Sequence, residues 1–330
     1  MRSACSMARR VAAALGVMGA AAAMAQPVDS SRLDYRLQAR PLAAGSWVIE
    51  GAVDDFRRGN GCNIINTAFI ATAEGVVVIN TGPSLRYGQQ QRRLIERTTG
   101  QPVVQVLNLN LHPDYFFGNQ AWADRAPQAL AGSIAGMRAE GEAYADNLYR
   151  LCGDWMQGTV ATPAAATWTP GLQTLGAHRL HTLRLAGHTA DDLVLIDLHT
   201  RVAYVGGLVF ADRVPTTPHA DFEAWLRSLD QLQALQAAGV FRTVVPSHGP
   251  VHEGPRGIEQ TRDWIRWATS HMRDSAEAGL DLVELMGQPP AARFAGWAAQ
   301  PAEWHRTLAR WYPVYEREAL PLRPATDSHP

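Results

Sequence analysis

The chain has 330 residues, of which 46% are hydrophobic and 18% are charged, and its 30 basic residues, all arginines, face 31 acidic ones for a net charge of −1. This apolar content with so little charge excludes an intrinsically disordered chain, and the balanced charge gives no general attraction to nucleic acid. Beyond residue 25, no apolar run reaches the roughly 18 residues that a membrane span needs. We therefore expect no nucleic-acid partner and no membrane span.

Residues 1–25 have the pattern of a secretory signal peptide. Arginines at positions 2, 9 and 10 precede a short apolar run over 11–23, and Ala23-Met24-Ala25 supplies small residues at the cleavage positions. The apolar run is too short for a membrane anchor. We therefore expect cleavage near Gln26 and an exported, most simply periplasmic, mature protein.

Export changes how the two cysteines of the mature chain are interpreted. Cys62 and Cys152 are 90 positions apart, and an oxidising compartment allows a disulfide between them. Closing a loop of that length would stabilise the fold by about 4–5 kcal/mol in the chain-entropy model. Two buried free thiols fit the sequence equally well, so the sequence leaves both arrangements open.

In chain order, the first half of the mature chain alternates between apolar runs typical of strands and stretches typical of helices. We predict strands over 46–53, 64–71, 75–80 and 103–109 and helices over 87–98 and 134–151. Gly100 and Pro102 end the first of these helices. Residues 159–170, with small side chains, threonines and two prolines, are expected to form a linker.

The second half repeats this arrangement. Short strands are predicted over 180–185, 192–197, 201–205 and 243–246, and helices over 221–237 and around 258–272. The tail over 297–320 is expected to be helical and is rich in tryptophan and tyrosine. Strands with intervening helices in both halves predict a layered α/β fold built from two similar units.

Polar side chains follow several of these strands, where loops collect a site on a rigid sheet. The segments are 110–115, 187–189, 205–208 and 247–250. They contain three histidines and one carboxylate, namely His112, His188, His248 and Asp114. Imidazole and carboxylate groups are common zinc ligands, so these segments indicate a zinc site.

The order of the segments resembles that of the metallo-β-lactamase superfamily over essentially all of the mature chain. The matching segments are Val-Val-Val-Ile-Asn-Thr-Gly-Pro-Ser at 76–84, the 110–115 segment in place of His-x-His-x-Asp-His, Ala-Gly-His-Thr at 186–189, Gly-Gly-Leu-Val-Phe at 206–210 and Ser-His-Gly-Pro at 247–250. The resemblance implies a four-layer αββα sandwich. It also implies one domain over 26–330, with two β/α halves at about 40–165 and 170–330 and a C-terminal helical tail.

A finer resemblance is to the zinc metallohydrolases of quinoprotein relay systems. It depends on the segments 146–150, 153–156 and 216–221. This branch implies a hydrolase that attacks an ester, thioester or amide. The expected partner of this protein is a small-molecule substrate or ligand, or a periplasmic redox-system protein.

The metal motif departs from the superfamily pattern, in which seven positions supply metal ligands. This chain keeps four of them: His112, Asp114, His188 and His248. Asn110, Tyr115 and Gly207 stand at the other three. Asn80 replaces the carboxylate that supports the motif loop. Because Gly207 removes the carboxylate that bridges two ions, a two-zinc site would lack both ligands and negative charge.

At most one zinc ion is therefore expected, surrounded by the four retained residues or by three of them and a water. The metal-bound water would be the nucleophile, and Asp114 is the candidate catalytic residue that orients this water as a general base. The alternative is a catalytically inactive periplasmic binding or accessory protein that keeps the fold and the pocket. The retained residues would then only join loops by hydrogen bonds, with Asp114 capping a helix that begins near Phe117.

Three further side chains are candidates for lining the pocket: Tyr115, Trp155 and His219. Packing or surface exposure is the ordinary explanation for each of them. Four other histidines have no partner at a ligand spacing and are expected to be solvated: His178, His181, His199 and His271.

Overall fold

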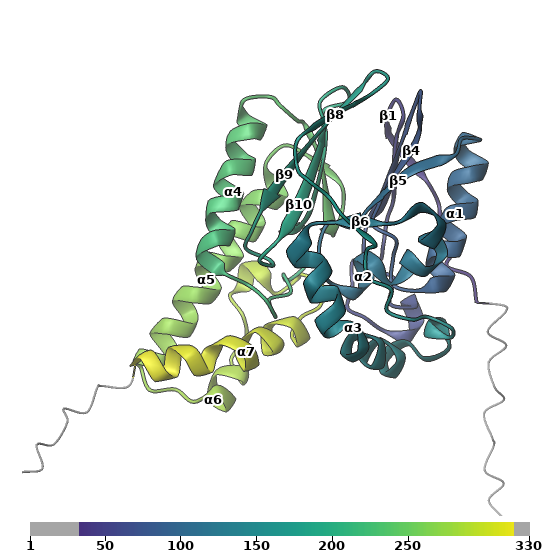
Figure 1. Ribbon diagram of the computed structural model, residues 1–330. Helices are drawn as coiled ribbons and strands as arrows, with labels where there is room; N and C mark the ends of the chain where they lie inside the picture. Colours follow the sequence, from purple (N-terminus) through teal and green to yellow (C-terminus); the bar gives the residue numbers. More distant parts are fainter. Residues whose placement is uncertain (1–32, 320–330) are drawn as a thin grey trace, which may run out of the picture.

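Two β-sheets pack face to face, and helices cover the outer face of each sheet (Figure 1). The computed structural model describes residues 33–319, so the predicted signal peptide over 1–25 lies outside the described residues. The order helices, sheet, sheet, helices confirms the predicted four-layer αββα sandwich. Within the described part of the chain, no helix has the length and apolar character needed to cross a membrane.

Seven strands form the first sheet, in the order in which they occur in the chain. They are β1 (Arg40–Ala43), β2 (Ser46–Ile49), β3 (Thr67–Thr72), β4 (Gly75–Ile79), β5 (Val103–Leu107), β6 (Gln128–Ala129) and β7 (Ala166–Thr167). Neighbours from β1 to β4 are antiparallel, and those from β4 to β7 are parallel. β4 is buried along its whole length because both faces of the sheet are covered, which explains its unbroken run of valine and isoleucine.

The second sheet has six strands in the order β13-β12-β11-β10-β9-β8. They are β8 (Leu172–Leu175), β9 (His178–Leu185), β10 (Asp192–Asp197), β11 (Val202–Phe210), β12 (Thr243–His248) and β13 (His252–Glu253). β11 and β12 are parallel, and the other neighbours are antiparallel. The crossover between the two parallel strands is the helix α4 (Phe222–Ala237), as parallel pairing requires.

Helices cover the two sheets on opposite sides of the molecule. α1 (Leu85–Thr99) covers the first sheet, with α2 (Pro113–Phe116) and α3 (Ala131–Cys152) near its lower end in Figure 1. α4 and α5 (Arg256–Glu277) cover the second sheet, and α6 (Leu282–Met286) and α7 (Ala302–Ala319) follow. Short 3-10 helices occupy Arg58–Asn60, Phe117–Arg125, Gly153–Met156 and Ala292–Phe294.

Apolar side chains of both sheets meet in a shared core. Ile70, Val77 and Leu107 of the first sheet belong to the same buried cluster as Leu195 and Tyr204 of the second. A larger cluster lies on the other face of the second sheet, against α4, α5 and α7. The aromatic tail helix α7 is part of that core, because its Trp304 and Tyr312 are fully buried.

Asn66, just before β3, joins the first sheet to the end of β12 in the second. Its side-chain nitrogen donates to the carbonyl oxygens of Pro246 (2.9 Å) and Gly249 (2.7 Å). Its side-chain oxygen accepts from the backbone nitrogen of Gly51 at 3.1 Å, and its own backbone nitrogen donates to Ser247 at 2.7 Å. One buried amide thus satisfies polar groups of both sheets.

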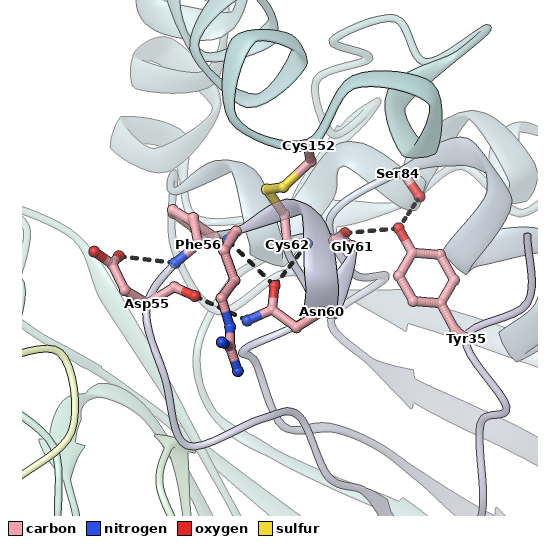
Figure 2. Close-up of a disulfide and its surroundings, with 9 residues drawn as sticks. Tyr35, Asp55, Phe56, Asn60, Gly61, Cys62, Ser84 and Cys152 are labelled. Carbon is pink, nitrogen blue, oxygen red and sulfur yellow. Dashed lines mark hydrogen bonds between the residues drawn. A yellow bond between two sulfur atoms is a disulfide. The ribbon is translucent and has the colours of Figure 1, made fainter. Parts of the chain in front are cut away.

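Cys62 and Cys152 form a disulfide, which is one of the two arrangements that the sequence left open (Figure 2). Their Cα atoms lie 6.0 Å apart, and the bond joins the loop before β3 to the end of α3. The Asn60 side chain holds this loop by accepting from the backbone nitrogen of Cys62 at 3.0 Å. The hydroxyl of Tyr35 donates to the Gly61 carbonyl at 2.9 Å and also lies 2.9 Å from Oγ of Ser84.

Two expectations from the sequence need correction. The strand predicted over 201–205 continues as β11 to Phe210, because Gly206 adopts a left-handed φ of 57° and shifts the register with β12 without ending the strand. The histidine at 178 is not solvated: it is 6% exposed, and its Nδ1 lies 2.7 Å from Oδ2 of Asp197. Pairing with a buried carboxylate explains why this imidazole is buried.

Candidate functional site

The four retained motif residues come from the loops and strand ends of both sheets, and all of them are buried. His112, Asp114, His188 and His248 have exposed fractions of 6%, 2%, 0% and 2%. They form two pairs. Phe210 contacts a member of each pair, since its ring centroid lies 5.5 Å from that of His188 and 5.1 Å from that of His248.

The first pair consists of His112 and His188. Their rings are nearly perpendicular, at 89°, with centroids 4.5 Å apart. Burial lowers the pKa of His112 well below its usual value, and the neighbouring imidazoles, His188 first, lower it further. His112 is therefore a neutral imidazole at physiological pH.

The second pair consists of Asp114 and His248, with Oδ2 of the carboxyl 3.4 Å from Nε2 of the imidazole. His248 donates its Nδ1 proton to the carbonyl oxygen of Ile64 at 3.0 Å, so Nε2 is its unprotonated nitrogen. Burial lowers the pKa of His248 well below its usual value and raises that of Asp114 to about 7. Below neutral pH, a protonated carboxyl therefore faces an unprotonated nitrogen.

Asn110, at a substituted ligand position, holds both histidines of the first pair. Its side-chain oxygen accepts from the backbone nitrogen of His112 at 3.0 Å, and its side-chain nitrogen lies 3.2 Å from Nδ1 of His188. Because the amide nitrogen only donates, Nδ1 of His188 accepts. The ring proton then lies on Nε2, which donates to Oγ1 of Thr216 at 3.2 Å. Both ring nitrogens of His188 thus have protein partners.

Gly207, at the second substituted position, lies directly against the His188 ring. A Cβ atom added to Gly207 would be 1.9 Å from Nδ1 and 2.3 Å from Cε1 of that ring. Any side chain at this position would overlap the imidazole, so the close approach requires glycine. In the superfamily pattern this position carries the bridging carboxylate, and here the imidazole of His188 fills that space.

A chain of hydrogen bonds runs from His112 toward the surface. Nε2 of His112 lies 3.0 Å from Nδ1 of His219, and Nε2 of His219 lies 2.9 Å from Oε1 of Glu140. The hydroxyl of Tyr144 donates to the same carboxylate at 2.6 Å. Because a carboxylate accepts, the network places a proton on Nε2 of His219, and one of the two rings donates in the bond between Nδ1 of His219 and Nε2 of His112. This chain connects the first pair to side chains that are partly exposed.

Tyr115, the third substituted position and a candidate pocket residue, is fully buried. Among the described residues, its hydroxyl has no hydrogen-bond partner, and neither has Oγ of Ser247 or Oδ2 of Asp114. Burial raises the pKa of Tyr115 well above its usual value, and the carboxyl of Asp114 raises it further. The phenol therefore stays neutral.

The other predicted site residues have different surroundings. His219 contacts His112, as described above, but Trp155 packs beside the disulfide, with its ring centroid 4.4 Å from that of Tyr35. Asp114 does not cap a helix at Phe117: Phe116 is the N-cap there, and it makes no side-chain cap hydrogen bond. Asn80 supports the motif loop, since its Oδ1 accepts from the backbone nitrogen of Leu109 at 2.9 Å.

Sequence reasoning did not find Glu140 or assign a role to Thr216. Glu140 lies on α3, and its partner His219 is 79 positions away, so no local motif marks it. Thr216 lies in the segment 216–221, which the sequence singled out only by resemblance. Both residues satisfy ring nitrogens of histidines of the site.

A zinc ion needs three or four donors that converge at about 2.0–2.3 Å. Across residues 33–319, no three His, Cys, Asp or Glu side chains converge in this way. The donors that would have to converge are engaged elsewhere: His188 by Asn110 and Thr216, and His112 by His219. As they are arranged, the four retained side chains do not fit a zinc ion.

Comparison with known proteins gives concordant matches. The family model described as the metallo-beta-lactamase superfamily matches residues 60–248, more than half of the chain. The metallo-β-lactamase from Pontibacter korlensis is 20% identical, with a TM-score of 0.56 over 70% of this chain and 99% of its own. The DIM-1 metallo-β-lactamase exposed to ceftazidime is 17% identical, with a TM-score of 0.53 over 70% of this chain and 96% of its own. At these identities the structural likeness shows the fold alone.

Proposed function

The chain belongs to the metallo-β-lactamase superfamily and is a metallohydrolase-like protein, and we propose that it acts as an exported binding or accessory protein without zinc catalysis. In this proposal the place of the metal centre is taken by buried side chains that hydrogen-bond to one another. The mature protein works in the periplasm, where its partner is a small molecule or a redox-system protein.

The contact between Gly207 and His188 carries the proposal. The imidazole of His188 fills the space where the superfamily has the bridging carboxylate side chain at position 207. A Cβ atom added to Gly207 would lie only 1.9 Å from Nδ1 of this ring. Asn110 and Thr216 bind its two ring nitrogens. To ligate a metal through either nitrogen, this ring would have to break the buried hydrogen bond at that nitrogen, which contributes about 0.5–1.5 kcal/mol.

Two further features support it. Nε2 of His112 is hydrogen-bonded to His219, which in turn donates to Glu140. A buried disulfide between Cys62 and Cys152 suits an oxidising compartment, in agreement with the signal-peptide pattern of residues 1–25. Membership of the quinoprotein relay branch rests on the sequence segments 146–150, 153–156 and 216–221 and is part of the proposal.

One observation favours a second candidate function, a hydrolase with a single zinc ion. Oδ2 of Asp114 is buried without a hydrogen-bond partner among the described residues, and it faces the unprotonated Nε2 of His248 at 3.4 Å. A carboxylate oxygen beside an imidazole nitrogen is a common donor pair for zinc. For this function, His112 or His188 would have to leave its present partner and turn toward the pair.

Zinc content distinguishes the two candidates. The mature protein is dialysed against zinc, freed of loose metal, and its zinc per chain is measured by elemental analysis. We expect a ratio near zero. A ratio near one that is lost in both His112→Ala and His248→Ala, and kept in the control His181→Ala on β9, would replace the binding protein with the one-zinc hydrolase. A ratio near two would contradict both candidates.

The reverse substitution tests the same geometry. Asn110→His, Tyr115→His and Gly207→Asp are introduced together, which restores all seven ligand positions. We expect this variant to bind zinc, because the restored donors would release His188 from its present partners. Gain of zinc together with esterase activity would show that these three positions alone separate this protein from the zinc hydrolases of its superfamily.

A further inference from the structure

A hollow of about 440 Å³ lies between α1 and the segment that precedes β1, on the outer side of the first sheet. None of the residues that line it belongs to the site described above. Its walls are formed by four arginines, one glutamine, one aspartate and three leucines: Arg36, Arg86, Arg93, Arg97, Gln90, Asp34, Leu33, Leu37 and Leu94. The hollow is thus strongly basic in a chain with a net charge of −1.

Three of the arginines project from one face of α1. Arg86, Arg93 and Arg97 are seven and four positions apart, which places them on the same side of a helix. Arg36 approaches from the preceding segment. Within residues 33–319, none of these four guanidinium groups forms an ion pair, so no carboxylate of the described residues neutralises their charge by direct contact.

The hollow is held in place by hydrogen bonds. Arg86 and Gln90 both donate to the carbonyl oxygen of Leu33, at 3.3 and 3.4 Å, and the backbone nitrogen of Tyr35 donates to the Gln90 side chain at 2.9 Å. The single carboxylate of the lining is engaged locally, because Oδ1 of Asp34 accepts from the backbone nitrogen of Arg36 at 2.8 Å. Ligand binding therefore needs little rearrangement of the backbone.

One nitrogen of the lining arginines lacks a hydrogen-bond partner in the fold. Nε of Arg86 is buried and has no hydrogen-bond acceptor among the described residues. A buried donor on a charged group costs free energy when it is left unpaired. Because this atom is shielded from the open hollow, an anion is indicated by the four guanidinium groups that line the hollow.

We propose that this hollow binds a small organic polyanion, with two or more carboxylate or phosphate groups on a compact body. Guanidinium groups bind carboxylate and phosphate oxygens in pairs, with planar geometry. Four of them around one hollow suit more than one anionic group. The apolar side chains of Leu37 and Leu94 suit the body that carries these groups. This site is independent of the zinc question and of the proposed function.

The test uses the mature protein and two probes, citrate and inorganic pyrophosphate, measured by isothermal titration calorimetry at low salt. We expect one-to-one binding of at least one probe. The double variant Arg93→Gln/Arg97→Gln should weaken this binding at least about tenfold, since it removes two charge-assisted contacts. The matched control Arg138→Gln/Arg266→Gln changes the net charge equally, at two exposed arginines on α3 and α5 that form no ion pair with the described residues, and should leave the affinity within about twofold.

The choice of probes separates the two chemistries. Citrate binding without pyrophosphate binding would assign a polycarboxylate, and the reverse would assign a phosphate compound. Arg86→Gln gives a third measurement, because it removes a positive charge from the wall of the hollow and should weaken either complex. The proposal is overturned if neither probe binds at millimolar concentration, if the control variant weakens binding as much as the α1 variant, or if the protein binds only anionic vesicles.

Discussion

The side-chain nitrogen of Asn110 lies 3.2 Å from Nδ1 of His188, so the amide is hydrogen-bonded to a ring nitrogen in the middle of the candidate site. The same amide accepts from the backbone of His112 through its oxygen. The asparagine that replaces a metal ligand at position 110 thus hydrogen-bonds to both histidines of the first pair. Asn110 is therefore part of a hydrogen-bonded arrangement, and Gly207 leaves room for the His188 ring in it, which gives both positions measurable effects on stability.

Replacing Asn110 with alanine should destabilise the fold. The change leaves Nδ1 of His188 and the backbone nitrogen of His112 buried without their partners, and each loss costs about 1–3 kcal/mol. We expect a decrease of about 2–4 kcal/mol in the free energy of unfolding, measured by urea denaturation. Asn147→Ala on the exposed side of α3 is the control and should stay within about 0.5 kcal/mol of the wild type.

Gly207→Ala should be destabilising although it adds only a methyl group. The new Cβ would lie 1.9 Å from the His188 ring, which must move out of its hydrogen bonds. We expect a loss of about 1–3 kcal/mol in calorimetric or urea unfolding, typical of overpacking. Gly59→Ala, where an added Cβ meets nothing within 4 Å, is the matched control. Equal stability of the two variants would mean that the ring moves freely, contrary to the arrangement described here.

Removing the disulfide should destabilise the protein without changing its fold. The bond closes a loop across 90 positions, for which the chain-entropy model gives about 4–5 kcal/mol. We expect a reductant to lower the midpoint of unfolding of the wild type and to leave the Cys62→Ala/Cys152→Ala variant unaffected. A wild type that is insensitive to full reduction would contradict a stabilising role for this bond.

The Asp114→Asn variant should gain stability relative to the wild type as the pH rises. Burial raises the pKa of this carboxyl from 3.8 to about 7, so the folded state keeps a proton that the unfolded state loses in this range. The contribution of the Asp114 carboxyl to the free energy of unfolding is fully present below pH 3.8 and is lost as the pH rises through 7. We expect the variant to gain up to about 4 kcal/mol over the wild type between low and neutral pH. Urea denaturation at several pH values measures this, with the exposed Asp146→Asn as control.

His252 should give the opposite pH dependence. Its Nε2 accepts from the backbone nitrogen of Gly257 at the start of α5, at 3.0 Å, and burial lowers its pKa below 6.5. A depressed imidazole pKa contributes stability above pH 6.5 that is lost as the pH falls. We expect His252→Ala to cost about 1 kcal/mol at pH 7.5 and less at pH 5. A cost that is independent of pH would show that the imidazole acts only by packing.

Much of the fold could be predicted from the sequence, because hydrophobic periodicity marks buried strands and helices. The strand over 192–197 has the predicted limits, and α1 and α3 extend the predicted helices by a few residues. The short edge strands β1, β8 and β13 could not be predicted, because their residues are partly exposed and lack a clear alternation. The continuation of β11 through Gly206 was missed because a glycine pair ordinarily ends a strand.

The site could be predicted only as a set of residue types. Motif spacing brought His112, Asp114, His188 and His248 to one end of the two sheets, but it could not show that they would form two pairs. That outcome depends on the rotation of the His188 ring into the space beside Gly207 and on Glu140, which lies far from its partner in sequence. Contacts of this kind are set by packing in three dimensions and leave no local pattern.

The hydrogen bonds of Asn66 have a consequence for access to the buried pairs. They join the start of β3 to the end of β12, next to His248, so spreading the two sheets at this end would break several buried bonds together. The frame around the site is therefore rigid. Away from this junction, the hydrogen-bonded chain from His112 ends at His219 and Glu140, whose side chains are 27% and 36% exposed, so the first pair is linked to solvent by hydrogen bonds through these two groups.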